Sequence, residues 1–110
     1  MSQRVRLYRE GHDTDDGRRI EQTQWSDGPI PALFEARVIG TVTEIQREDE
    51  GWVTGELTTE ENVAGLAAEA DFDNVEIDMT GEVSVITNAR LRAVTLGRRP
   101  TWREMWIGDD

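Results

Sequence analysis

The stretch NVEIDMTGEVSVITNARLRAVTL, residues 74–96, carries the densest β-strand signal in the chain. It contains three short apolar runs separated only by a Thr-Gly pair and a Thr-Asn pair. In the first run Val75, Ile77 and Met79 recur at every second position, which is the pattern of a half-buried strand. The third run, residues 91–96, is apolar on both faces. We therefore expect this third run to be a central strand of the sheet.

The segment before it predicts a long β-hairpin. Residues 37–47, RVIGTVTEIQR, are rich in β-branched side chains, residues 48–51 supply a turn, and residues 52–58 return. Gly40 and Gly55 interrupt the two strands. Glycines at such positions indicate bulges or close strand contacts, of the kind that curl a small sheet.

One helix is expected between the hairpin and residue 74. Thr58 followed by Glu61 matches a capping box, with Thr58 as the N-cap. Small apolar residues then recur at helical spacing: Val63, Leu66, Ala67 and Ala70. We expect this helix to pack its narrow stripe on the sheet.

Length and composition predict one domain without disulfides. The chain has 110 residues and no cysteine, and no apolar run approaches the roughly 18 residues that span a bilayer. We expect an extended N-terminal segment over residues 1–31, with one edge strand around Val5 and Leu7, and a β-rich domain over residues 32–110. A membrane-bound protein is not expected.

The charge is strongly negative, because 23 acidic residues face 12 basic ones for a net charge of −11. A field of this sign opposes direct binding to nucleic acid. Every basic residue is arginine. That choice is explained either by a GC-rich coding sequence or by interface ion pairs, for which the planar guanidinium suits carboxylates.

Metal and cofactor sites are not predicted. The acidic cluster at residues 13–17 lacks the ligand spacing of a calcium loop, so we interpret it as an Asp/Gly turn. Glu76 and Asp78 share the outer face of an expected strand, which leaves a metal site or a solvated acidic face. We expect the solvated face.

Several ordered motifs resemble one family. Residues 85–100, VITNARLRAVTLGRRP, are the most specific of these motifs. Residues 16–20, DGRRI, precede Trp25 and a Pro-Ile-Pro run, and the IGTVTEI strand follows. In this order the motifs are similar to those of the prohead (head-maturation) serine proteases of tailed phages. The resemblance implies an α+β fold: a small, strongly bent or barrel-like antiparallel sheet, with one short helix.

The resemblance does not imply activity. The family's nucleophilic serine position reads Glu76, and the segment that carries its catalytic histidine is missing before residue 37. The only histidine is His12, and the only serines are Ser2, Ser26 and Ser84. A hydroxyl without a positioned base is a poor nucleophile. No catalytic residue is therefore assigned, and we expect a non-enzymatic protein.

The resemblance places the protein in the phage head, assembled in the host cytoplasm. We expect a capsid decoration protein that binds the major capsid protein and forms homo-oligomers on the capsid surface. The alternatives are a procapsid assembly or scaffold factor, a residual head-maturation protease, and an unrelated acidic binding module. Aromatic and large apolar residues are the usual interface anchors. The candidates are Leu7, Tyr8, Trp25, Trp102 and Trp106.

Overall fold

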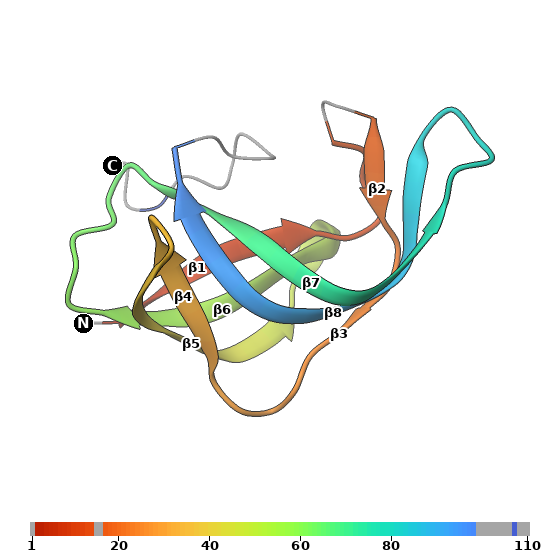
Figure 1. Ribbon diagram of the computed structural model, residues 1–110. Coiled ribbons are helices and arrows are strands. Elements are labelled where there is room, and N and C mark those ends of the chain that lie inside the picture. The colour runs from red at the N-terminus through yellow and green to blue at the C-terminus, as the bar shows by residue number, and fades with distance from the viewer. Residues whose placement is uncertain (1, 15–16, 99–106, 108–110) are drawn as a thin grey trace.

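The computed structural model describes residues 2–14, 17–98 and 107, which form one curled, half-barrel sheet (Figure 1). The strands follow the order β1-β6-β5-β4-β8-β2, and β3 and β7 also pair with β8. Their bounds are β1 Ser2–Arg9, β2 Arg18–Ile20, β3 Thr23–Gln24, β4 Ile30–Phe34, β5 Arg37–Arg47, β6 Trp52–Thr59, β7 Ala67–Asp78 and β8 Ser84–Gly97. The helical part of the described chain is the short 3-10 turn η1, Asp49–Gly51.

Strand β8 organises the sheet because both of its edges are paired. Its antiparallel partner is β7, while β2, β3 and β4 pair with it in parallel along the other edge. The register with β7 shifts between Leu91 and Ala93, so Leu91 and Val94 pair with Phe72 and Ala70 and share the core face, where 1% and 0% of their surface is exposed. The prediction of a central strand over residues 91–96 is confirmed.

The predicted hairpin is also confirmed, as β5, η1 and β6. A Cβ on Gly40 would meet the carbonyl oxygen of Thr58 and the Cβ of Thr59 on the neighbouring strand. A Cβ on Gly55 would meet the side chain of Val42 across the curl. The register shifts beside Gly40, so close contact and a bulge occur together there. Both glycines thus let the sheet bend sharply.

The expected α+β class is wrong, because the predicted helix does not form. Thr59, not Thr58, accepts a hydrogen bond from the Glu61 N–H, at 3.1 Å, and Asn62 Oδ1 accepts one from the Ala64 N–H, at 3.1 Å. Gly65 then adopts a φ of +81°, a left-handed conformation that interrupts a right-handed helix. These local contacts shape a loop over residues 60–66. Ala67 and Ala70, which matched the helical spacing, belong instead to the start of β7, where Ala67 is buried and Ala70 is partly buried.

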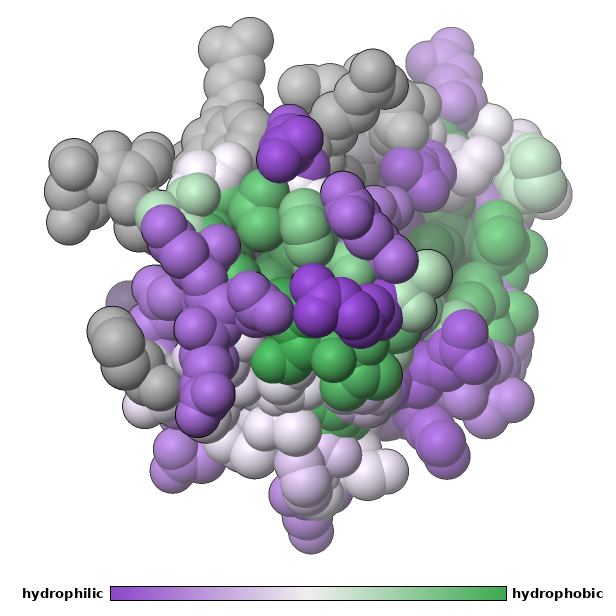
Figure 2. Space-filling view, turned by 60° about the vertical axis from the view of Figure 1, so that its left-hand side comes forward, coloured by the Kyte–Doolittle hydropathy of each residue, from purple (hydrophilic) through white to green (hydrophobic). Residues whose placement is uncertain are grey.

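The core lies inside the curl of the sheet. Its side chains with at most 1% exposure include Leu7, Val42, Val53, Leu57 and Val94. On the face drawn in Figure 2, apolar residues in the middle are bordered by polar and charged ones.

Residues of the expected extended N-terminal segment form part of this same sheet. Strand β1 pairs with β6 and occupies an end of the strand order, which confirms the predicted edge strand. Strands β2 and β3 lie against β8, and the side chain of Ile20 is buried. The N-terminal strands therefore help to enclose the core.

Candidate functional site

The outer halves of β7 and β8 form a hairpin that projects from the sheet, at the right of Figure 1. We call residues 74–88 the β7–β8 arm. The arm begins at Asn74, whose φ of +52° accompanies a shift in the register with β8. Ile77 then faces Ile86, and Asp78 faces Val85. The chain turns between Asp78 and Ser84, whereas the Thr-Asn pair at residues 87–88, which separates the second and third apolar runs, lies at a bulge within the continuous β8.

Large apolar side chains of this arm are exposed. Val75 is 41% exposed, Ile77 55% and Met79 72%. Ile20, Ile86 and Ile77 are opposed in register across β2, β8 and β7, so they share a face of the sheet. Exposure rises along this row from 7% at Ile20 to 55% at Ile77. An apolar stripe thus continues from the core onto the surface. The expectation that residues 75–79 form a half-buried strand is wrong.

The arm is also acidic, and its carboxylates at positions 76 and 78 lie on the strand face opposite to Ile77. Glu76, Asp78 and Glu82 lie within the arm, and residues 74–88 contain no arginine or lysine. Asp78 Oδ1 accepts hydrogen bonds from the Thr80 N–H, at 2.9 Å, and from the Thr80 hydroxyl, at 2.7 Å. These two bonds hold the pKa of Asp78 below its usual value, the backbone bond having the larger effect. The carboxylate at the tip is therefore charged at neutral pH.

The backbone edge of the arm is poorly suited to adding another strand. In the described chain β7 is paired only with β8, which leaves its other edge without a ladder. The register of β7 with β8 shifts three times between Asp71 and Ile77, one shift being a bulge in β7 itself between Asp73 and Glu76, and acidic side chains stand along β7. Bulges and charges are devices that protect edge strands from pairing with other chains. The side-chain face of the arm, rather than its backbone edge, is thus the surface offered for contact.

The predicted interface residues are distributed differently. Leu7 is 0% and Tyr8 1% exposed, so both are core residues and the expectation that they anchor a partner is corrected. Trp25 is partly buried, and the guanidinium of Arg47 stacks over its ring at 4.6 Å. Trp102 and Trp106 lie outside the described residues.

Tyr8, near the end of β1, belongs to a polar network with Thr23, Glu10 and Arg47. Its hydroxyl lies 2.6 Å from Thr23 Oγ1, which donates to Glu10 Oε2 at 2.7 Å. Arg47 donates to Glu10 Oε1 at 2.8 Å and to the Thr23 carbonyl at 2.6 Å. Burial raises the pKa of Tyr8 well above its usual value, so its hydroxyl stays protonated. This network fastens β3 to β1 and β5, and it has a structural role.

The residues considered for protease chemistry are not assembled. His12 lies in an exposed turn, where its Nδ1 is 3.1 Å from the Glu10 carbonyl oxygen. The Ser84 N–H donates to the Gly17 carbonyl, and Glu76 is exposed on the arm. In the described part of the chain, no serine hydroxyl is hydrogen-bonded to His12.

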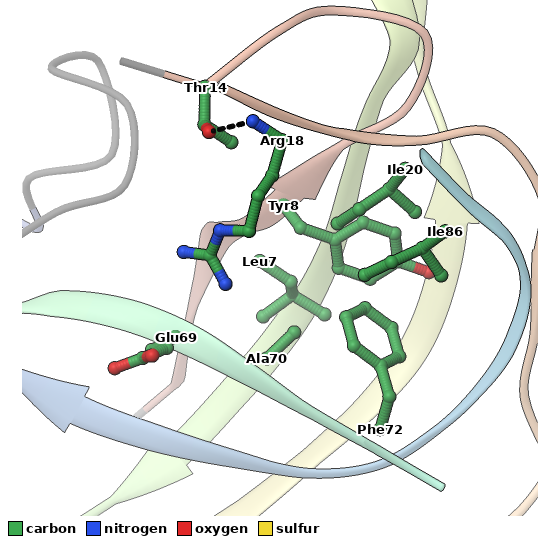
Figure 3. A pocket seen from close by; sticks show the side chains of 9 residues that line it. All are labelled: Leu7, Tyr8, Thr14, Arg18, Ile20, Glu69, Ala70, Phe72 and Ile86. Carbon is green, nitrogen blue, oxygen red and sulfur yellow. Dashed lines mark hydrogen bonds between the residues drawn. The ribbon is translucent and has the colours of Figure 1, made fainter. Parts of the chain in front are cut away.

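The apolar pocket beside Tyr8 is small. A pocket of about 90 Å³ lies between β1, β2 and β7, with Tyr8, Ile86 and Phe72 among its apolar walls and Arg18 at its rim (Figure 3). Ligand pockets are typically about 300–1,000 Å³, so this one is too small for a cofactor. Among residues 2–14, 17–98 and 107, no three His, Asp or Glu side chains are grouped to hold a metal ion. The described residues also contain no helix long and apolar enough to cross a membrane.

The sequence pattern of the arm was visible, but it was interpreted as one face of a half-buried strand and not as an exposed contact surface. Alternation at Val75, Ile77 and Met79 predicts a strand with one apolar face, and it does not say what covers that face. The absence of basic residues from 74–88 was the additional signal.

Comparisons with protein-family models, with curated proteins and with solved structures found no match. The resemblance to the prohead proteases therefore stays a prediction from sequence motifs.

Proposed function

We propose that this chain is a non-enzymatic structural protein that docks on other protein surfaces through the β7–β8 arm. Its proposed setting is the phage head, where it acts as a capsid decoration protein. The observation that carries the proposal is the run of exposed apolar side chains on the arm, from 41% to 72% exposed.

Apolar contact is the source of affinity in this proposal. Burying apolar surface contributes about 25 cal/mol per Å², whereas an exposed ion pair contributes roughly 0–1 kcal/mol. Ile77 and Met79 therefore supply the binding energy. The carboxylates on the other face of the arm favour a partner with basic residues beside its apolar patch, because like charges across an interface are repelled.

The capsid setting comes from the sequence motifs and from the charge. The motifs resemble a family that works in the phage head, and Glu76 stands where that family has its nucleophile. A net charge of −11 would be repelled by packaged DNA, so the outer surface of the head is favoured over the filled interior.

Cosedimentation of the purified protein with mature phage heads tests the proposal. We expect saturable binding that falls at least tenfold in the double variant Ile77→Ser, Met79→Ser. The matched control is Val38→Ser, because Val38 is 61% exposed but lies away from the arm. This control should bind as the unaltered protein does.

Equal loss of binding in the arm variant and in Val38→Ser would contradict the arm as the docking surface. Binding to procapsids but not to DNA-filled heads would replace the decoration role with the assembly-factor role. No binding to either particle would refute the capsid setting.

A further inference from the structure

A groove of about 270 Å³ lies at the end of the sheet opposite to the arm. It is formed by the end of β4, the start of β5 and the loop of residues 60–66, which appears at the left of Figure 1, whereas the arm projects at the right. Phe34, Ile39 and Leu66 supply apolar wall, while Arg37 and Arg98 bring guanidinium groups. We call it the β4–β5 groove.

The described lining of the β4–β5 groove has a positive net charge, although the protein as a whole is strongly acidic. The described residues that line it include two arginines and one acid, Glu61, for a net charge of +1 among them. Arg37 lies 3.5 Å from Glu61, with both side chains largely exposed. Arg98 is exposed and has no ion-pair partner among the described residues. In three other pockets of the described chain, acids equal or outnumber arginines.

We infer that the β4–β5 groove binds the β7–β8 arm of a second copy of this chain. The arm has the complementary composition, since Glu76, Asp78 and Glu82 are its charged residues, and Arg19, which lies across β8 from Asp78, is ion-paired with Asp13 and Glu21. Met79, 72% exposed, is the side chain that enters the groove, because a flexible thioether chain fits irregular apolar walls. The carboxylates of the arm then meet Arg37 and Arg98. This inference rests on the proposed role of the arm and names its partner.

The two surfaces are different, so a contact between them can repeat from copy to copy. The arm and the groove lie at opposite ends of the sheet, which allows each copy to give its arm to one neighbour and its groove to another. Such head-to-tail contacts close into rings or continue as chains. The net charge of −11 opposes association in solution. On a capsid lattice, each bound copy raises the effective concentration of the next.

Charge exchange tests the contact by sedimentation velocity of the full chain. The arm variant is Glu76→Arg with Asp78→Arg, and the groove variant is Arg37→Glu with Arg98→Glu. Each variant alone pairs like charges and should stay monomeric. An equimolar mixture restores opposite charges at both contacts. We expect the mixture to form dimers and larger species at least tenfold more tightly than either variant alone.

The matched control is Glu21→Arg with Asp27→Arg, which removes the same negative charge outside the arm. Reduced net charge alone should favour association, so this control should associate at least as well as the unaltered protein. Circular dichroism verifies that every variant is folded. A mixture that stays monomeric, or an arm variant that associates as well as this control, would overturn the inference.

The same variants separate this inference from the proposed function. If mixing restores no association while Ile77→Ser with Met79→Ser still abolishes capsid binding, the second-copy contact is refuted and the docking role stands. If mixing restores association while capsid binding is absent throughout, the capsid setting is refuted and the contact stands.

Discussion

In the network of Tyr8, Thr23 and Glu10, the donor and the acceptor of each hydrogen bond can be assigned. The Glu10 carboxylate only accepts hydrogen bonds, so the one proton of the Thr23 hydroxyl goes to Glu10. The Tyr8 hydroxyl must then donate to Thr23 Oγ1. The chain of donors therefore runs from Tyr8 through Thr23 to Glu10, inside a site where Tyr8 is 1% and Thr23 2% exposed.

This polarity predicts unequal costs for two substitutions that each remove one hydroxyl. Tyr8→Phe removes a donor but leaves the bond from Thr23 to Glu10, so we expect a loss of about 1 kcal/mol in the free energy of unfolding. Thr23→Val leaves the buried Tyr8 hydroxyl unpaired, so the loss should be about 1–3 kcal/mol. Urea denaturation measures both. A larger cost for Tyr8→Phe than for Thr23→Val would contradict the assigned direction.

The stability of the turn at the tip of the arm depends on pH through Asp78. Its pKa is lowered in the folded chain by the two bonds from Thr80, so the unfolded chain holds its proton more tightly. The stability contributed by the turn is thus fully present above the usual pKa of an aspartate. It is lost as the pH falls through the lowered value. Thr80→Ala removes the hydroxyl and keeps the N–H, so the pKa of Asp78 should rise part of the way back in an NMR titration. An unchanged pKa in this variant would refute the role of the hydroxyl.

At the scale of the strands, close backbone contact shapes the curl. Gly40 pairs with Thr59, and it has no room for a Cβ against the Thr58 carbonyl. Gly40→Ala should therefore cost about 1–3 kcal/mol by forcing β5 away from β6. Gly28→Ala is the matched control, since no atom outside its immediate chain neighbours lies within 4 Å of the added Cβ. It should stay within about 0.5 kcal/mol of the unaltered protein. Thermal melts that shift equally in the two variants would contradict this explanation of the curl.

Strands were easier to predict than the helix, for a physical reason. The glycines in the hairpin and the apolar run at residues 91–96 are tied to strand geometry, and the predicted hairpin and central strand are both confirmed. Apolar spacing at residues 63–70 also matched a helix. There the left-handed Gly65 and two side-chain hydrogen bonds to backbone N–H groups favour a loop. Such competition between local contacts and helix is decided by three-dimensional context.

At the scale of the whole molecule, the pairing between distant strands decides which apolar faces are buried, and the sequence pattern alone does not show this. Alternation places Ile77 on an apolar face, but only the order β2-β8-β7 shows that this row leaves the core and becomes exposed. Burial of Leu7 and Tyr8 depends likewise on β1 closing one side of the curl. The candidate site was therefore misplaced, because the contact surface depends on which apolar faces remain uncovered after folding.

The central claim is that the arm touches another protein when the chain does its work. The most direct test places a photo-cross-linking amino acid at Met79 or, in a separate preparation, at Thr41, an exposed position of β5 that does not line the β4–β5 groove. The protein is bound to phage heads and irradiated. We predict cross-links from position 79 to a capsid subunit or to the groove of a second copy, and few from position 41. An efficient cross-link from position 41 with none from position 79 would contradict the account.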